Sequence, residues 1–162
     1  MDTQTPFRHP PQHLPQPRVR PQPTTPGEVR CAEALLGVLT SAGVRHYYGV
    51  PGGAISATYD ALHARPDLRV VHVRHESSAA HMAIGHAVVR PDEMVCVLTT
   101  SGPGVTNLLT GLSSAYAERV PLIVLAGEVP RVKFGRGALQ EGGPGAMDIV
   151  AMARSVTRLA EL

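Results

Sequence analysis

The chain has 162 residues and a formal net charge of +2 at pH 7, and 43% of its residues are hydrophobic. This length suits a single domain that buries roughly two thirds of its surface. The small net charge indicates no nucleic-acid partner, and no apolar run approaches the ~20 residues of a membrane span. Cys31 and Cys96 lie in apolar patterns far apart in the sequence. We therefore expect two buried, reduced thiols in a cytoplasmic protein.

Residues 1–26 differ from the rest of the chain in composition. They hold more than half of the fifteen prolines, separated mainly by Gln, His, Arg and Thr, and contain few apolar residues. Such a segment cannot bury enough apolar surface to offset the entropy lost on ordering. We expect a disordered, proline-rich tail at residues 1–26 and one folded domain at residues 27–162.

The folded domain is predicted to begin with a helix. Thr25 suits the N-cap, Pro26 the first helical position, and Glu28 the acidic member of a capping box. An apolar stripe with helical spacing follows, comprising Ala32, Leu35, Leu36 and Leu39, and the helix is expected to end near Gly43.

Strands and helices then alternate along the chain. The pattern predicts a strand at 45–50, a helix at about 54–64, a strand at 68–73 and a helix at about 77–89. The following strand, 94–98, has no polar alternation, as expected of a central parallel strand that is covered on both faces.

Three further elements complete the pattern. A helix after residue 102 carries an apolar stripe, residues 121–126 form an apolar strand, and a short helix is expected at 148–154 after a glycine-rich loop. The alternation predicts an α/β fold with a doubly wound, mostly parallel sheet and helices on both faces.

Three loops follow the expected strands: Gly49-Val50-Pro51-Gly52-Gly53-Ala54, His75-Glu76-Ser77 and Thr100-Ser101-Gly102-Pro103-Gly104. Ligands in such sheets bind at the carboxyl ends of the strands. None of the loops is a P-loop or a G-x-G-x-x-G motif, and each alone could be only a tight turn. Glu76 changes this interpretation, because a carboxylate after a buried strand is rare unless it is paired or functional.

Four segments together resemble a known family: YGVPGGA, VRHESSAAHMAIGHA, TTSGPGVTNLLTGLSSAYAERVPLIVLAGEVP and GALQE. In this order and spacing they resemble the N-terminal pyrimidine-binding domain of thiamine-diphosphate enzymes. The greatest similarity is to the acetolactate (acetohydroxyacid) synthases, which are 2-oxo acid carboligases. The resemblance covers nearly all of residues 27–158 and implies the thiamine-diphosphate-binding fold.

The resemblance implies that Glu76 is catalytic. It matches the family glutamate that hydrogen-bonds N1′ of the cofactor's aminopyrimidine and shares a proton with it, which favours the 4′-imino form that removes the C2 proton. The alternative is a helix-start acid favoured by the helix dipole. The other cofactor-binding candidates are Gly52, Gly53, Ser101, Gly102, Pro103, Gly104, Asn107 and Gln140. For Gln140 the alternative is a loop amide that bonds its own backbone.

Other candidates have less support. Arg158 matches a basic residue near the substrate path of the synthases, although a solvated surface arginine is equally compatible with the sequence. Pro130 and Arg131 match the start of a loop over the family site, so they are binding candidates. His72, His75, His81 and His86 lack metal-ligand spacing and are expected to be structural or surface residues. No metal ligand is therefore expected in this chain.

Two departures from the family concern specificity. Gly137-Ala138-Leu139-Gln140-Glu141 stands where the family has Asp-Ala-Phe-Gln-Glu, so an acid and an aromatic are missing. The glycine-rich insert 142–146 follows directly. Both departures weaken an assignment to acetolactate synthesis specifically, so a specialised carboligase or decarboxylase is an alternative activity.

A third departure is length. In the resembling enzymes a separate domain with a G-D-G motif and a distal Asn holds the diphosphate and Mg²⁺, and FAD lies mostly on a middle domain. This sequence contains neither, and the domain's last helix and strand are expected beyond residue 162. We therefore expect a chain that is inactive alone and needs a diphosphate-binding domain or subunit, as a homo- or hetero-oligomer. The alternative is a non-catalytic fragment or interaction module that keeps the fold.

Overall fold

The computed structural model describes residues 28–143 and 145–162, so the predicted tail and the capping residues Thr25 and Pro26 lie outside the described residues. The elements in chain order are α1 (Cys31–Ser41), β1 (His46–Gly49), the 3₁₀ helix η1 (Gly53–Ile55), α2 (Ser56–His63), β2 (Arg69–His72), α3 (Glu76–Val89), β3 (Val95–Thr99), α4 (Pro103–Ala117), β4 (Ile123–Ala126), the 3₁₀ helix η2 (Arg131–Lys133) and α5 (Ile149–Arg154). The predicted alternation of helices and strands is confirmed.

The four strands form one parallel sheet in the order β2-β1-β3-β4. Strand β1 lies between β2 and β3, with His46 in register with Arg69 on one side and Val95 on the other. The chain moves outward from β1 in one direction to β2, and then in the opposite direction through β3 to β4. The order therefore reverses between β1 and β3, and in such sheets ligands bind at the carboxyl side of that switch point.

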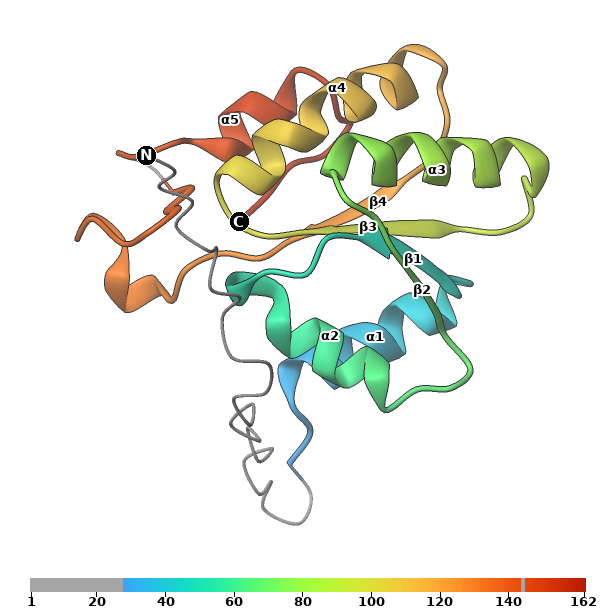
Figure 1. Cartoon of the computed structure of the whole chain (residues 1–162), viewed down its shortest axis with the longest axis horizontal. Coiled ribbons are helices and arrows are strands. Elements are labelled where there is room, and N and C mark those ends of the chain that lie inside the picture. The colour runs from blue at the N-terminus through green and yellow to red at the C-terminus, as the bar shows by residue number, and fades with distance from the viewer. Residues whose placement is uncertain (1–27, 144) are drawn as a thin grey trace, which may run out of the picture.

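Helices cover both faces of the sheet, as predicted (Figure 1). Helices α1 and α2 lie on one face, and α3 and α4 lie on the other. Successive side chains of β1 point to opposite faces: Tyr47 packs into the core beneath α1 and α2, and Tyr48 packs into the core beneath α3. Every residue of β3 is buried, which confirms the prediction of a central strand.

Strand β4 is less buried than its apolar sequence suggests. It pairs with β3 along one side, its first three residues are half-buried, and Ala126 is exposed. Among the described residues, no helix is long and apolar enough to cross a membrane.

Two expectations about the first helix are wrong. Helix α1 begins at Cys31, and Arg30 before it has an extended backbone, so Glu28 lies outside the helix. The contacts explain the later start, because Arg30 forms ion pairs with Glu33 and with Asp60 of α2. Cys31 is exposed instead of buried, since it lies off the face of α1 that packs on the core, to which Ala32, Leu36 and Leu39 contribute.

The other expectations for this region hold in part. Leu36 and Leu39 of the predicted stripe are buried, whereas Leu35 is exposed, because the stripe is wider than the face that contacts the sheet. Cys96 is buried as expected, and both cysteines are free thiols.

Candidate functional site

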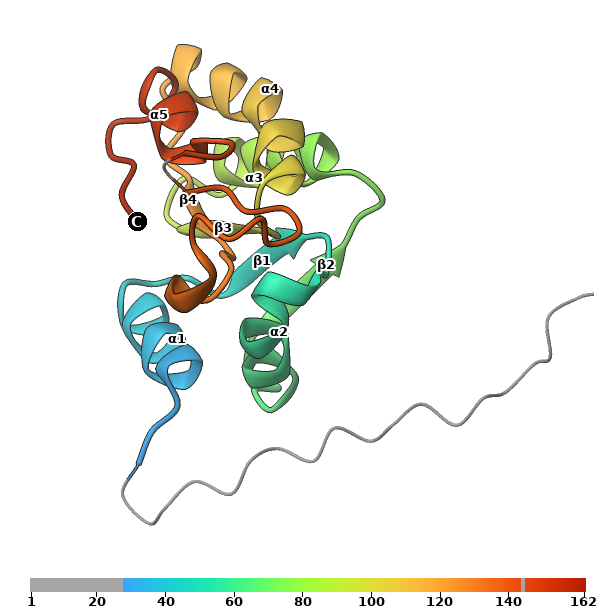
Figure 2. The same cartoon turned by 90° about the vertical axis from the view of Figure 1, so that its left-hand side faces the viewer.

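The loops that follow the strands meet at one edge of the sheet. Figure 2 views the molecule from this side, with the segment 127–143 crossing in front of the strand ends. The segment contains η2 and is otherwise loop, as predicted. The edge is therefore built from four loops, one after each strand.

Glu76 is the first residue of α3 and is buried, with 7% of its surface exposed. The Asn107 side-chain amide, from α4, donates a hydrogen bond to Glu76 Oε2 at 3.1 Å. A second bond ties the same two helices, because Ser77 Oγ donates to the Asn107 carbonyl at 2.5 Å. The carboxylate is therefore held in a defined position between α3 and α4.

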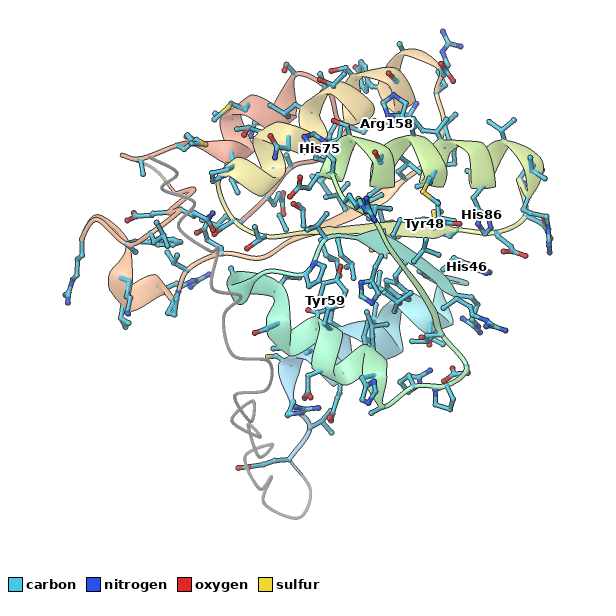
Figure 3. The ribbon with its side chains drawn as sticks, viewed as in Figure 1. His46, Tyr48, Tyr59, His75, His86 and Arg158 are labelled. Atoms are coloured by element: carbon cyan, nitrogen blue, oxygen red, sulfur yellow. The ribbon has the colours of Figure 1, made fainter. Side chains whose placement is uncertain are left out.

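His75 caps the helix that begins with Glu76. Its Nδ1 accepts a hydrogen bond from the Ser77 backbone N–H at 3.2 Å, and Figure 3 shows His75 at the start of α3. This satisfies one of the free N–H groups of the first turn. The expectation that His75 is structural is confirmed. Glu76 also occupies the helix-start position that the dipole favours, so the two interpretations of this residue are compatible.

Two glycines allow the walls of the site to approach closely. A Cβ on Gly104 would lie 2.5 Å from Thr99 Oγ1 and 3.5 Å from Glu76 Oε1. A Cβ on Gly52 would lie 2.6 Å from the Cβ of Thr100. The turn after β1 and the turn after β3 therefore pack at distances that only glycine permits.

Gly102 forms the contact with the loop after β4. Its backbone has φ +53°, and a Cβ there would lie 2.7 Å from the Gln140 carbonyl oxygen. Gln140 itself has φ +61°, a left-handed conformation that is uncommon for a residue with a side chain. The structure thus brings the main chain of Gln140 to the predicted site, while its side chain is exposed.

Two carboxylates that the sequence interpretation did not select hold this loop. Glu128 accepts hydrogen bonds from the Gly142 backbone N–H at 3.1 and 3.2 Å, and buried Glu141 accepts one from the Gly135 N–H at 2.6 Å. Glu128 follows β4 much as Glu76 follows β2. The sequence signal that could have identified Glu128 was therefore an acidic residue shortly after a predicted strand.

The remaining predicted residues differ in their surroundings. Ser101 is fully buried beside the turn, and Pro103 is the exposed first residue of α4. The space beside Gly53 is open, since no atom of residues 28–143 or 145–162 lies within 4 Å of a Cβ placed there. Arg158 is exposed beyond the end of α5, and Arg131 is exposed in η2.

The polar side-chain groups at the switch point suit a small heteroaromatic ring. Besides the Glu76 carboxylate, the Thr99 and Thr100 hydroxyls are buried and have no hydrogen-bond partner among the described residues. Buried polar atoms of this kind ordinarily find a partner, so an unpaired pair beside a buried carboxylate suits a ligand that carries ring nitrogens and an amino group. The aminopyrimidine of thiamine diphosphate has these groups.

A second group of polar residues lies at the opposite, amino edge of the sheet. His86, which was expected to be a structural or surface residue, lies there with His46 and Glu93, and their possible ligand atoms are within 4.8 Å of one another. The sequence interpretation searched for local spacing of histidines and missed this group, because its members come from a strand, a helix and a turn that are separate in the sequence.

Comparison with known proteins agrees with this geometry. Residues 29–152 match the family described as "Thiamine pyrophosphate enzyme, N-terminal TPP binding domain". The chain is 39% identical over 127 residues to the acetolactate synthase large subunit of Haemophilus influenzae. It is 42% identical over 127 residues to the acetolactate synthase isozyme 3 large subunit of Escherichia coli K12, and 47% identical over 112 residues to a probable acetolactate synthase large subunit of Methanocaldococcus jannaschii.

The matched regions cover most of this chain and a small part of each relative. They span 78% of the chain and 21% of the two bacterial proteins, and 68% of the chain and 18% of the Methanocaldococcus protein. The chain therefore matches about a fifth of the length of these relatives. The family match, the parallel sheet and the glycine-lined strand ends together show that this chain belongs to the thiamine pyrophosphate enzymes, as an N-terminal TPP-binding domain.

Proposed function

We propose that this chain is the pyrimidine-binding part of a cytoplasmic, acetolactate-synthase-like 2-oxo acid carboligase or decarboxylase. A separate domain or subunit, in a homo- or hetero-oligomer, holds the diphosphate and Mg²⁺. The observation that carries the proposal is the buried Glu76 carboxylate, fixed by Asn107 at the carboxyl side of the sheet's switch point.

The cofactor supplies the carbon-bond chemistry when it is bound, and the protein supplies binding, orientation and proton transfer. In this proposal Glu76 would exchange a proton with the pyrimidine ring nitrogen. Its burial removes water that would otherwise compete for this hydrogen bond. Asn107 keeps Oε2 occupied and so directs the carboxylate, while Gly52 and Gly104 let the turns after β1 and β3 pack closely beside it.

The loop after β4 covers the substrate side in this proposal. The main chain of Gln140 packs on Gly102, and Glu128 and Glu141 fix the loop around it. The names of the relatives favour acetolactate synthesis and thus branched-chain amino acid biosynthesis. Leu139 is largely exposed where the family carries an aromatic residue, which leaves a different acceptor or a simple decarboxylation open. Arg158 is the candidate for contact with the substrate carboxylate.

A chimera tests the role of Glu76 in a complete enzyme. The matching 127 residues of the Escherichia coli isozyme 3 large subunit are replaced by those of this chain, either unchanged or with the substitution Glu76→Gln. We expect Glu76→Gln to slow hydrogen–deuterium exchange at C2 of the bound cofactor by about 10²–10⁴-fold, because the amide cannot exchange a proton readily. Cofactor affinity should change much less, since the diphosphate anchor is untouched.

Glu118→Gln is the matched control, because Glu118 is an exposed carboxylate at the end of α4 and should leave exchange unchanged. Equal exchange rates in the unchanged chimera and its Glu76→Gln variant would reduce Glu76 to a helix-start acid. A folded chimera that binds no thiamine diphosphate would instead favour the non-catalytic interaction module.

A further inference from the structure

Three polar side chains meet at the amino edge of the sheet, away from the candidate active site. His46 is the first residue of β1, His86 lies in the last turn of α3, and Glu93 precedes β3. Figure 3 shows both histidines at the opposite end of α3 from His75. Each can offer one ligand atom, and these atoms lie within 4.8 Å of one another.

The distances within this cluster are those of a metal site that needs little adjustment. Glu93 Oε2 lies 3.3 Å from His46 Nδ1 and 2.9 Å from His86 Nε2. Zn²⁺ binds imidazole nitrogen and carboxylate oxygen at about 2.0–2.2 Å, which places tetrahedral ligand atoms about 3.4 Å apart. Small side-chain rotations would therefore open enough space for the ion between the three atoms.

The second nitrogen of His86 is also placed as in metal sites. His86 Nδ1 lies 2.7 Å from the Tyr48 hydroxyl, which can accept a hydrogen bond from Nδ1–H. That tautomer leaves the Nε2 lone pair directed at the cluster. Outer hydrogen bonds of this kind orient metal-binding histidines and strengthen binding.

Burial and access both suit a bound ion. The side chains of His46, His86 and Glu93 are 31%, 12% and 21% exposed, so an ion can enter and water can complete its coordination. The carbonyl end of α3, where His86 lies, also favours a cation.

Two arginines oppose cation binding. Arg90 pairs with Glu93 Oε1, the oxygen that faces away from the histidines, and Arg69 acts on His46 through its charge. Both remain compatible with a bound ion, because Glu93 Oε2 is the oxygen shared with the two histidines. They should nevertheless weaken its binding.

We propose that His46, His86 and Glu93 form a three-ligand Zn²⁺ site. Two imidazoles and one carboxylate match the preference of Zn²⁺, whereas Mg²⁺ prefers oxygen ligands throughout. The ion ties the start of β1 and the end of α3 to the turn before β3. Its role is structural, and it is distinct from the Mg²⁺ that accompanies a diphosphate.

The test uses the full chain, stripped of metal with a chelator and then titrated with ZnCl₂ by calorimetry and by thermal unfolding. We expect one Zn²⁺ per chain and a Tm that rises with Zn²⁺ but not with Mg²⁺. Glu93→Gln and His86→Gln should each weaken binding by at least about 10-fold. His63→Gln, at an exposed position at the end of α2, is the control, and the double variant His9→Gln/His13→Gln tests the sequence before residue 28. Both variants should bind Zn²⁺ as wild type does.

Arg90→Gln provides a test that leaves all three ligands in place. Removing this positive charge from beside Glu93 should tighten Zn²⁺ binding severalfold. It decides the question if the ligand variants fail to fold. The proposal is overturned if the wild-type chain binds no Zn²⁺, if folded Glu93→Gln and His86→Gln bind it as tightly as wild type, or if Arg90→Gln leaves the affinity unchanged or lower.

Discussion

Glu76 owes its position to an amide from another helix. The bond from Asn107 Nδ2 joins residues 31 positions apart in the sequence and is the hydrogen bond that fixes Oε2. At the scale of single residues, the candidate site is therefore a pair of side chains: Glu76, for which we propose proton exchange, and Asn107, which orients its carboxylate.

Removing the amide should disturb orientation more than binding. In the chimera described above, Asn107→Ala should lower kcat by about 10-fold or more while the affinity for thiamine diphosphate stays nearly constant. Steady-state kinetics together with cofactor titration separate these effects. Thr110→Ala, at an exposed position one turn further along α4, should change neither quantity. A matching loss of cofactor affinity in Asn107→Ala would mean that Asn107 contacts the cofactor directly.

Tyr59 makes the alkaline stability of the fold testable. Burial raises its pKa to about 12, and its hydroxyl is buried without a hydrogen-bond partner in the described part of the chain. An unfolded tyrosine ionises near pH 10, so between pH 10 and 12 the unfolded state loses its proton first. Stability that is fully present below pH 10 is therefore lost as the pH rises towards 12.

Replacing Tyr59 with Phe should reduce this loss. At pH 7 the variant should be as stable as wild type within about 1 kcal/mol, because the lost hydroxyl had no partner. Between pH 9 and about 11.5 its free energy of unfolding, measured in urea, should fall less steeply. Tyr47 and Cys96, whose pKa values burial also raises to about 12, keep part of the slope. Tyr116→Phe, at an exposed position, should lose stability with pH as steeply as wild type does. If the free energy of unfolding of Tyr59→Phe falls as steeply as that of Tyr116→Phe, the argument is refuted.

At the scale of elements, the site depends on how closely α3 and α4 approach each other. Small residues make this possible, since a Cβ on Gly111 of α4 would lie 2.3 Å from the Cβ of Ala80 on α3. Both residues are buried. The same helix pair carries Glu76 and Asn107, so the spacing of the helices also sets the hydrogen bond at the site.

Gly111→Ala should therefore force the two helices apart. We expect a loss of about 1–3 kcal/mol in the free energy of unfolding, as for other overpacked cores, measured by urea denaturation. Gly85→Ala is the matched control in α3, where a Cβ meets nothing within 4 Å in the part of the chain that the structure describes. That substitution should stabilise the helix by about 0.5–1 kcal/mol. Equal effects of the two substitutions would contradict the close packing of α3 on α4.

At the scale of the whole molecule, the chain matches about a fifth of the length of its relatives. It carries the carboxylate proposed for the aminopyrimidine. No ligands for a diphosphate and Mg²⁺ were identified in its sequence. In cofactor sites of this kind, protein carboxylates hold Mg²⁺, and the Mg²⁺ binds the phosphate oxygens of the cofactor. The diphosphate and its Mg²⁺ therefore supply much of the affinity for thiamine diphosphate.

The purified chain alone should therefore bind thiamine diphosphate weakly and should not decarboxylate pyruvate. Calorimetry with the cofactor and Mg²⁺, and a coupled assay for CO₂ release, test the two parts. Turnover by the pure chain would show that it holds an unrecognised diphosphate site. Turnover that appears only when a diphosphate-binding subunit is added would support the proposed division of the active site.

The order of elements, the parallel sheet and the position of Glu76 were predictable from the sequence. These features depend on local signals: the apolar run of β3, the helical period of α4 and the glycine turns after the strands. The family resemblance was visible for the same reason, since its motifs are continuous stretches around those turns. The tail at 1–26 stays a prediction, because it lies outside the described residues.

Tertiary structure alone decided which distant side chains meet. The bond from Asn107 to Glu76 depends on the rotation of α4 about its axis, and the cluster of His46, His86 and Glu93 depends on β1 and β3 being neighbours. The exposure of Cys31 likewise follows from the face that α1 turns to the sheet. Local sequence patterns carry no information on these choices, because they are settled by the packing of complete elements against one another.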